Sequence, residues 1–335
     1  MIRLFTRLPY PQSQLAAVAL AFATAASSAA LHAQTDVPAA PAAPAAPAAA
    51  DASAGPVFPK PDAADFTATA PTRDQVLSFL QASWGYDPNR VFQVQRIAKT
   101  SVPGISNVIV AVGEKGAKQI QALQFFALPD GKHIIAQGEI LPFGDHPYAE
   151  NRAVIEQRAN GPSRGAADKK LEIVEFADFQ CPHCKEGQPS MEKITTDFPA
   201  AHVVFQNFPL VKIHPQAMIA AKYGHCVAKL GGNDAFFKFA NAAFDGQAGL
   251  ATADGAQLTL NSAVTAAGQD PAKVAACVKE PETEASIKAD VQLAEDLGVN
   301  QTPMLAINGR LIPLGGLDYE TLKKIIAYHA ANESK

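Results

Sequence analysis

Apolar residues in helical and alternating patterns predict a small domain over residues 66–145. A short helix is expected over residues 72–85, where Thr72 can serve as the N-cap. Runs with strand-like alternation follow at residues 91–97, 107–112, 120–127 and 133–140. Turn-forming residues at 113–116 and 129–132 separate the last three runs. One helix and a meander of antiparallel strands make an α+β fold.

A second and larger domain is predicted over residues 166–335. Its elements follow in the order strand, helix, strand, long helical segment, hairpin and helix, at residues 171–176, 182–198, 203–208, 216–297, 304–314 and 318 onwards. Asn308 and Gly309 form the two-residue turn that hairpins favour. The helical segment makes an insertion at about residues 211–300, in which His214 belongs to a turn rather than to a catalytic element. This order predicts an α/β fold.

The segments outside these domains carry export and linker signals. Residues 1–33 have Arg3 and Arg7, an apolar stretch and a small-residue end, which predict a cleaved signal peptide and a periplasmic location. An uncleaved membrane anchor is the alternative. Residues 34–65 are almost all Ala, Pro, Asp and Ser, so we expect an extended, solvated linker. Residues 146–165 are predicted to be a connecting helix that ends in a flexible glycine joint.

Charge gives little information about partners. The 335 residues include 28 Lys and Arg against 32 Asp and Glu, a formal net charge of −4. No segment of the sequence concentrates basic residues. We therefore expect neither nucleic acid nor a polybasic attraction to membranes.

The four cysteines form one close pair and two distant residues. Cys181 and Cys184 lie two residues apart, whereas Cys226 and Cys277 lie far from them and from each other. Exported proteins meet oxidising conditions in which thiols pair, so the even count suggests one catalytic and one structural pair. Two separately buried thiols are the alternative for the second. Zinc needs four converging ligands, usually in two close pairs, so we expect no metal and no cofactor.

The close pair has the spacing that disulfide exchange requires. Cys181 starts a predicted helix, where unpaired backbone N–H groups and the helix dipole favour a thiolate. Two intervening residues put Cys184 one turn along the same helix. Pro182 suits the first turn because its missing N–H would have no partner there, and His183 adds a donor or positive charge. The sequence predicts Cys181 as the exposed attacking sulfur and Cys184 as the buried resolving sulfur.

Residues 176–184, with the sequence FADFQCPHC, closely resemble the active-site segment of the DsbA family. That family carries a buried acid six residues before the first cysteine, so the resemblance implies that Glu175 exchanges protons with Cys184. A partly exposed strand residue is the alternative for Glu175. Thr302-Pro303 resembles the site where thioredoxin-fold proteins carry a cis proline facing the catalytic pair, beside backbone groups that can bind an extended substrate.

The first domain resembles another group of the same superfamily. Residues 101–105, 128–135 and 137–138 are similar to parts of the dimerisation domain of the periplasmic disulfide isomerases DsbC and DsbG. Thr302 also matches those isomerases, whereas typical DsbA proteins have Val there. The resemblance implies a homodimer; an unrelated β-meander with a packing role is the alternative, and a monomer would fit a simple oxidase.

These resemblances imply a thioredoxin fold with a helical insertion, preceded by a small α+β domain. Cys226 and Cys277 resemble the second disulfide of some DsbA relatives. The implied function is an exported thiol:disulfide oxidoreductase that oxidises or isomerises disulfides through a mixed disulfide at Cys181. Its expected partners are reduced or misfolded exported proteins and a membrane redox partner that recharges the pair. A non-catalytic periplasmic chaperone and a glutathione-dependent transferase are alternatives; the first would not need the CxxC, and the second typically keeps one catalytic residue.

Overall fold

The computed structural model describes residues 56–332. The predicted signal peptide and most of the predicted linker lie outside the described residues. The last ten residues of that linker are not a free tether, because they contact strand β1 (Arg90–Lys99). The Gln95 side chain donates a hydrogen bond to the Pro59 carbonyl (3.2 Å), and Asp65 forms an ion pair with Arg96 (3.4 Å). Asp65 also ends a short 3-10 turn, η1 (Ala63–Asp65).

The first sheet is antiparallel and has one helix packed on it. Its strands lie in the order β1-β2-β3-β4-β5, and the bounds of the remaining four are Ser106–Glu114 (β2), Ile120–Ala127 (β3), His133–Ala136 (β4) and Glu139–Pro142 (β5). Helix α1 (Arg73–Trp84) begins with a capping box between Thr72 and Gln75. Val76 and Leu80 of this helix belong to the same buried cluster as the inward side chains of the sheet. This agrees with the predicted α+β fold.

The predicted strand at residues 133–140 is wrong in one respect, because the chain reverses within it. Gln137 and Gly138 both have positive φ angles, 54° and 87°. Two successive residues in this region form a tight hairpin turn and cannot continue a strand. The segment is therefore the hairpin β4-β5, in which His133 lies opposite Pro142.

The second sheet contains the strand that leads to the cysteine pair. Its order is β10-β9-β7-β8-β6, with bounds Ser163–Gly165 (β6), Leu171–Ala177 (β7), Ala201–Asn207 (β8), Met304–Ile307 (β9) and Arg310–Pro313 (β10). Strands β7 and β8 run parallel, and the other neighbours are antiparallel. Every residue of the central strand β7 is buried. Such a strand is covered on both faces, which agrees with the predicted α/β fold.

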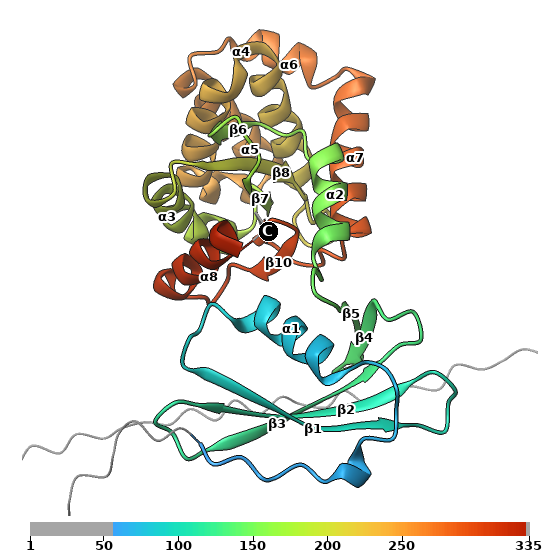
Figure 1. Cartoon of the computed structure of the whole chain (residues 1–335). Coiled ribbons are helices and arrows are strands. Elements are labelled where there is room, and N and C mark those ends of the chain that lie inside the picture. The colour runs from blue at the N-terminus through green and yellow to red at the C-terminus, as the bar shows by residue number, and fades with distance from the viewer. Residues whose placement is uncertain (1–55, 333–335) are drawn as a thin grey trace, which may run out of the picture. The chain divides into compact units, whose positions relative to one another are not determined.

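Helices cover both faces of this sheet (Figure 1). Their bounds are Ala149–Arg158 (α2), Pro182–Asp197 (α3), Pro281–Asp296 (α7) and Tyr319–Asn332 (α8). Helices α3 and α8 share a buried cluster with Ile173 of β7, whereas α2 and α7 share another with Val174. Adjacent residues of a strand point to opposite faces, so the two pairs of helices lie on opposite sides.

The flexible joint predicted at Gly165 is wrong. Residues 163–165 form strand β6, which pairs with β8 so that Gly165 lies opposite His202. A side chain at Gly165 would collide with the Ala201 carbonyl, and the φ angle of Gly165 is 90°, which other residues rarely adopt. Glycine is therefore required here for a close approach of two backbones rather than for mobility.

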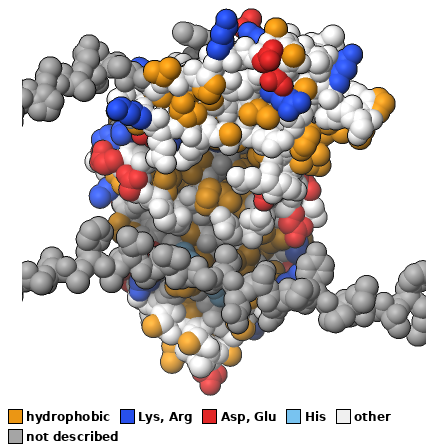
Figure 2. All heavy atoms as spheres, turned by 90° about the horizontal axis from the view of Figure 1, so that it is seen from below, with side chains coloured by type: hydrophobic (Ala, Val, Ile, Leu, Met, Phe, Trp, Pro, Cys, Tyr) orange, Lys and Arg blue, Asp and Glu red, His pale blue; other side chains and the backbone are white. Residues whose placement is uncertain are grey.

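The helical insertion consists of α4 (Ala217–Asp245), η2 (Gln247–Ala251), α5 (Ala253–Ala266), α6 (Pro271–Cys277) and α7. Within α4, Gly232 has a φ of 77° and kinks the helix. The aromatic side chains Phe236, Phe239 and Phe244 are buried in the core of the insertion. Among the described residues, no helix has the length and apolar character needed to span a membrane. Figure 2 shows basic and acidic side chains interspersed on one face, without a continuous basic area.

Candidate functional site

The loop between β7 and α3 positions the cysteine pair. Strand β7 ends at Ala177 and α3 begins at Pro182, so Cys181 is the N-cap of the helix with an extended backbone (φ −73°, ψ 121°). The Cys181 carbonyl accepts hydrogen bonds from the N–H groups of Cys184 (3.1 Å) and Lys185 (3.3 Å). The Cys181 sulfur therefore lies at the helix end where the first N–H groups lack helical partners.

Cys181 has the electrostatic environment of a stable thiolate. Its pKa is lowered to about 5, first by a hydrogen bond from Cys184 and then by Thr302 and the backbone N–H groups of His183 and Cys184, although burial opposes this. The residue is only 4% exposed, so it is less open than the sequence predicts. The carbonyl of Thr302 lies 3.6 Å from the sulfur.

Cys184 has the opposite environment. It is fully buried, and burial is the main cause that raises its pKa well above the ordinary value. Its sulfur accepts a hydrogen bond from the Asp178 backbone N–H (3.4 Å). One thiol of the pair therefore ionises readily and the other holds its proton.

Glu175 lies within β7 and is buried, with 4% of its surface exposed. Burial raises its pKa to about 7, although a hydrogen bond from Gln188 to Glu175 Oε1 (2.9 Å) opposes the shift. The alternative of a partly exposed strand residue is therefore wrong. The charge of Glu175 contributes to the raised pKa of Cys184, so the two groups are electrostatically coupled. A carboxyl with a pKa near neutrality can accept or donate a proton at this position.

Pro182 and His183 occupy the first turn of α3. Pro182 is the first helical residue, which is the position predicted for it. His183 is exposed, and its Nδ1 lies 2.9 Å from Glu186 Oε2. Glu186 raises the pKa of His183, and the Cys181 charge adds to this. This electrostatic interaction is mutual, so a protonated His183 imidazole favours the Cys181 thiolate.

Thr302 and Pro303 immediately precede β9, and the Thr302 carbonyl lies beside the same sulfur. The peptide bond between them is cis, as the resemblance implies. The carbonyl of Pro303 accepts a hydrogen bond from the Leu314 N–H (3.1 Å). Residues far apart in the sequence thus meet at Cys181.

The structure adds Asp178 and His214, which sequence reasoning missed. Asp178 is buried, and its carboxylate accepts hydrogen bonds from the backbone N–H groups of Gln180 (2.7 Å) and Leu210 (2.9 Å). His214 Nδ1 lies 2.7 Å from Asp178 Oδ2. Asp178 thus ties the loop before Cys181 to the turn at His214, through which the chain enters the insertion.

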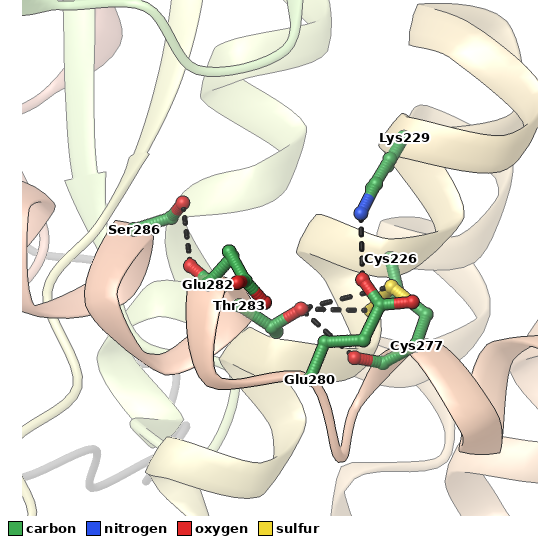
Figure 3. The surroundings of a disulfide bond; sticks show 7 residues. All are labelled: Cys226, Lys229, Cys277, Glu280, Glu282, Thr283 and Ser286. Atoms are coloured by element: carbon green, nitrogen blue, oxygen red, sulfur yellow. Dashed lines mark hydrogen bonds and ion pairs between the residues drawn. A yellow bond between two sulfur atoms is a disulfide. The ribbon is translucent and has the colours of Figure 1, made fainter.

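Cys226 and Cys277 form a disulfide inside the insertion, 51 residues apart in the sequence (Figure 3). The alternative of two separate buried thiols is therefore wrong. The Thr283 hydroxyl donates a hydrogen bond to the Cys277 carbonyl (2.9 Å) and lies 3.6 and 3.7 Å from the two sulfurs. Lys229 and Glu280 form an ion pair nearby (2.7 Å). Within residues 56–332, no group of three or more His, Cys, Asp or Glu has an arrangement that could hold a metal.

Comparisons with known proteins match the C-terminal half of the chain, which contains both cysteine pairs. The model of the family described as Thioredoxin matches residues 157–327, just over half of the chain. The match begins after the first domain, so the resemblance of residues 66–145 to DsbC and DsbG stays a prediction.

Similar solved structures include a periplasmic thioredoxin-like protein from Salmonella enterica serovar Typhimurium. It is 25% identical, with a TM-score of 0.46 over 55% of this chain and 97% of that chain. The thiol-disulfide exchange protein alpha-DsbA2 from Wolbachia pipientis is 24% identical, with a TM-score of 0.45 over 53% of this chain and 95% of that chain.

Among curated proteins, the chain is similar to segments of Na(+)/H(+) antiporters. NhaA 1 of Mycolicibacterium vanbaalenii is 30% identical over 149 residues, which cover 44% of this chain and 23% of the antiporter. NhaA 3 of Salinispora tropica is 32% identical over 68 residues, covering 20% of this chain and 10% of the antiporter. The chain therefore spans less than a quarter of the length of these relatives.

Proposed function

Because the chain belongs to the thioredoxin family, we propose that it is an exported thiol:disulfide oxidoreductase acting through Cys181 and Cys184. The observation that carries the proposal is the contrast within the pair: the pKa of Cys181 is lowered to about 5, whereas that of Cys184 is raised well above its ordinary value. Such a contrast separates an attacking or leaving sulfur from a buried resolving sulfur.

In the oxidising direction, a client thiolate attacks Cys181 of the Cys181–Cys184 disulfide. The sulfur–sulfur bond breaks, Cys184 leaves and takes up a proton, and a mixed disulfide forms between the client and Cys181. A second client thiolate then attacks the client sulfur of that mixed disulfide and releases Cys181 as its stable thiolate. The client gains a disulfide, and the pair is reduced by two electrons. Isomerisation starts instead from the reduced pair. The Cys181 thiolate attacks a client disulfide and one client sulfur leaves as a thiolate; another client thiolate then attacks the client sulfur of the mixed disulfide and releases Cys181, with no net transfer of electrons.

Glu175 is the proposed proton partner of Cys184. When Cys184 leaves, its raised pKa demands a proton, and a carboxyl with a pKa of about 7 can supply it. When Cys184 attacks a mixed disulfide, the proton must move the other way. The carboxylate form is then the active form, so this step should accelerate as pH rises through about 7.

The function is tested by equilibrating the mature chain with glutathione and measuring the reduction potential of the Cys181–Cys184 pair. We expect an oxidising potential, because a stable Cys181 thiolate stabilises the reduced form. Oxidation of a reduced client and rescue of a scrambled client separate oxidase from isomerase activity. Sedimentation of the same sample tests the predicted homodimer. A chain that exchanges no disulfide in either assay but still binds unfolded clients would replace this proposal with the chaperone alternative.

Replacing Glu175 by Gln should change pH dependence in two measurable ways. The attack of Cys184 on a preformed Cys181 mixed disulfide should slow by about tenfold to a hundredfold at pH 8 and lose its rise through pH 7. The second effect is on stability, which should rise in the variant above pH 7 although the exchange step slows. The folded-state pKa of about 7 exceeds the ordinary value of 4.5, so the wild-type free energy of unfolding falls as pH rises between these values. Removing the carboxyl should recover up to about 3 kcal/mol above pH 7.

Asp290→Asn is the matched control for Glu175→Gln. Asp290 is a second buried carboxyl, whose pKa burial raises to about 6, but its hydrogen-bond partners are Gln206 and Asn207. The control should alter the pH dependence of stability and leave that of the mixed-disulfide step unchanged. Equal effects of the two variants on the mixed-disulfide step would remove Glu175 from its proposed role.

A further inference from the structure

A glutamine of the helical insertion holds two carbonyls of the active-site loop. Gln247, the first residue of η2, donates hydrogen bonds from Nε2 to the carbonyls of Phe179 (2.9 Å) and Cys181 (2.8 Å). A side-chain amide has two N–H groups, so each carbonyl can receive one. Because Phe179 and Cys181 are both buried, these carbonyls have little access to water and depend on partners in the protein.

Further contacts attach the same loop to the insertion. The side chain of Gln180 donates to the Leu250 carbonyl (2.9 Å) and accepts from the Gln216 N–H (2.6 Å). The Phe179 ring packs against Phe239 and Phe244, with centroid separations of 5.6 and 5.1 Å. Gln180 and Phe179 hold the middle of the loop. Gln247 differs from them because it reaches the backbone of Cys181 itself.

The direction of the Cys181 carbonyl controls what surrounds its sulfur. As the N-cap, Cys181 uses this carbonyl to accept the first bonds of α3, from Cys184 and Lys185. Fixing the carbonyl therefore fixes the first turn relative to the loop, including the N–H groups of His183 and Cys184. If the carbonyl rotated, those N–H groups would move away from the sulfur.

We propose that Gln247 is a positioning residue, which aims the Cys181 sulfur at the amino end of α3 by anchoring the carbonyls of Phe179 and Cys181. It does not touch the sulfur and takes no part in proton or electron transfer. The insertion thereby sets the reactivity of the pair as well as covering it. The inference rests on the proposed thiol–disulfide function for its biological consequence, but the sulfur's own titration tests it directly. The backbone N–H groups that Gln247 holds in place are among the causes that lower the Cys181 pKa.

The test is the pH dependence of Cys181 alkylation in the full mature chain, with Gln247→Met compared to wild type. Methionine keeps the length of the side chain and removes both donors. We expect the Cys181 pKa to rise by about half a unit to one unit. The thiolate fraction at pH 4 then falls by about threefold to tenfold, and because a thiolate of higher pKa is more nucleophilic, the alkylation rate falls by about twofold to fourfold. The reduction potential of the Cys181–Cys184 pair should become more reducing, because a less stable Cys181 thiolate destabilises the reduced form. Gln247→Asn, whose shorter amide cannot reach both carbonyls, should shift the pKa in the same direction and serves if the methionine variant folds poorly.

Gln257→Met is the matched control. Gln257 is also a glutamine of the insertion, but its Nε2 donates to the Tyr223 hydroxyl (2.6 Å) and to Asn261 (3.2 Å), away from the loop. This variant should lower the melting temperature by a similar amount and leave the Cys181 titration unchanged. An unshifted titration in folded Gln247→Met, or equal shifts in both variants, would show that Gln247 only stabilises the fold. A wild-type Cys181 that titrates near 9 would instead refute the proposed function.

Discussion

Replacing Cys181 by Ser should abolish disulfide exchange, with a loss of at least about a hundredfold, whereas Cys184→Ala should trap the protein on its client. The two expectations differ because the two sulfurs do different chemistry. Cys181 forms and breaks the bond to the client, and only Cys184 can resolve that bond from within the protein. Non-reducing electrophoresis after mixing with a scrambled client, whose disulfides the Cys181 thiolate can attack, should show a mixed disulfide in Cys184→Ala and none in Cys181→Ser.

The reactivity of the wild-type sulfurs provides an independent measurement of the same assignment. At pH 6 a thiol with a pKa of about 5 is mostly ionised, about a thousandfold more than one at 9. A thiolate of lower pKa is a weaker nucleophile, which reverses roughly fortyfold to a hundredfold of this gain. Cys181 should therefore be alkylated about tenfold faster than an unperturbed thiol of equal accessibility, while Cys184 stays unlabelled. Preferential labelling of Cys184, or a mixed disulfide that survives loss of Cys181, would reverse the roles.

The sequence was sufficient to predict the elements around the site because their signals are local. The CPHC spacing, the apolar strand before it and the Asn308-Gly309 turn each lie within a few residues of what they determine. The burial of Glu175 also follows from a local pattern, since every position of β7 is covered. Gln188, whose side chain donates to Glu175, lies one helical turn after Cys184. Its position four residues after Cys184 places Gln188 on the same face of α3, a signal that could have revealed its contact with Glu175.

The contacts that fix the active-site loop could not be predicted in the same way. Gln247 is 68 residues from Phe179 in the sequence, and Gln180 is 70 residues from Leu250. Gln247 belongs to no motif, and glutamine in a helical segment is most often a solvated surface residue. Gln180 lies in the FADFQCPHC segment, but that segment does not reveal its contacts with the insertion. Such contacts depend on how the insertion packs on the loop, which the pattern of single elements does not determine. The same reason explains why the pairing of β6 with β8 was not predicted.

Replacing both Cys226 and Cys277 by Ala should lower the free energy of unfolding by about 4 kcal/mol. The disulfide closes a loop with a sequence separation of 51, and the chain-entropy model assigns a stabilisation of this size to such a loop. For a domain of this length the melting temperature should fall by roughly 10 °C. Alanine is the better substitution, because Ser would place an additional hydroxyl at a buried site already occupied by Thr283. Thermal and urea unfolding under non-reducing conditions measure both quantities.

Disulfide exchange should survive in the same double variant. Cys226 and Cys277 belong to the same buried cluster as Cys181 and Cys184, so the insertion must stay folded for the pair to keep its surroundings. Assays well below the lowered melting temperature satisfy this condition, and the Cys181 alkylation profile checks it. Under those conditions the exchange rate should stay within about twofold of wild type, because the structural disulfide touches none of the reacting atoms. A variant that keeps its stability but loses exchange would make Cys226–Cys277 a second redox relay, in which electrons pass between the two pairs.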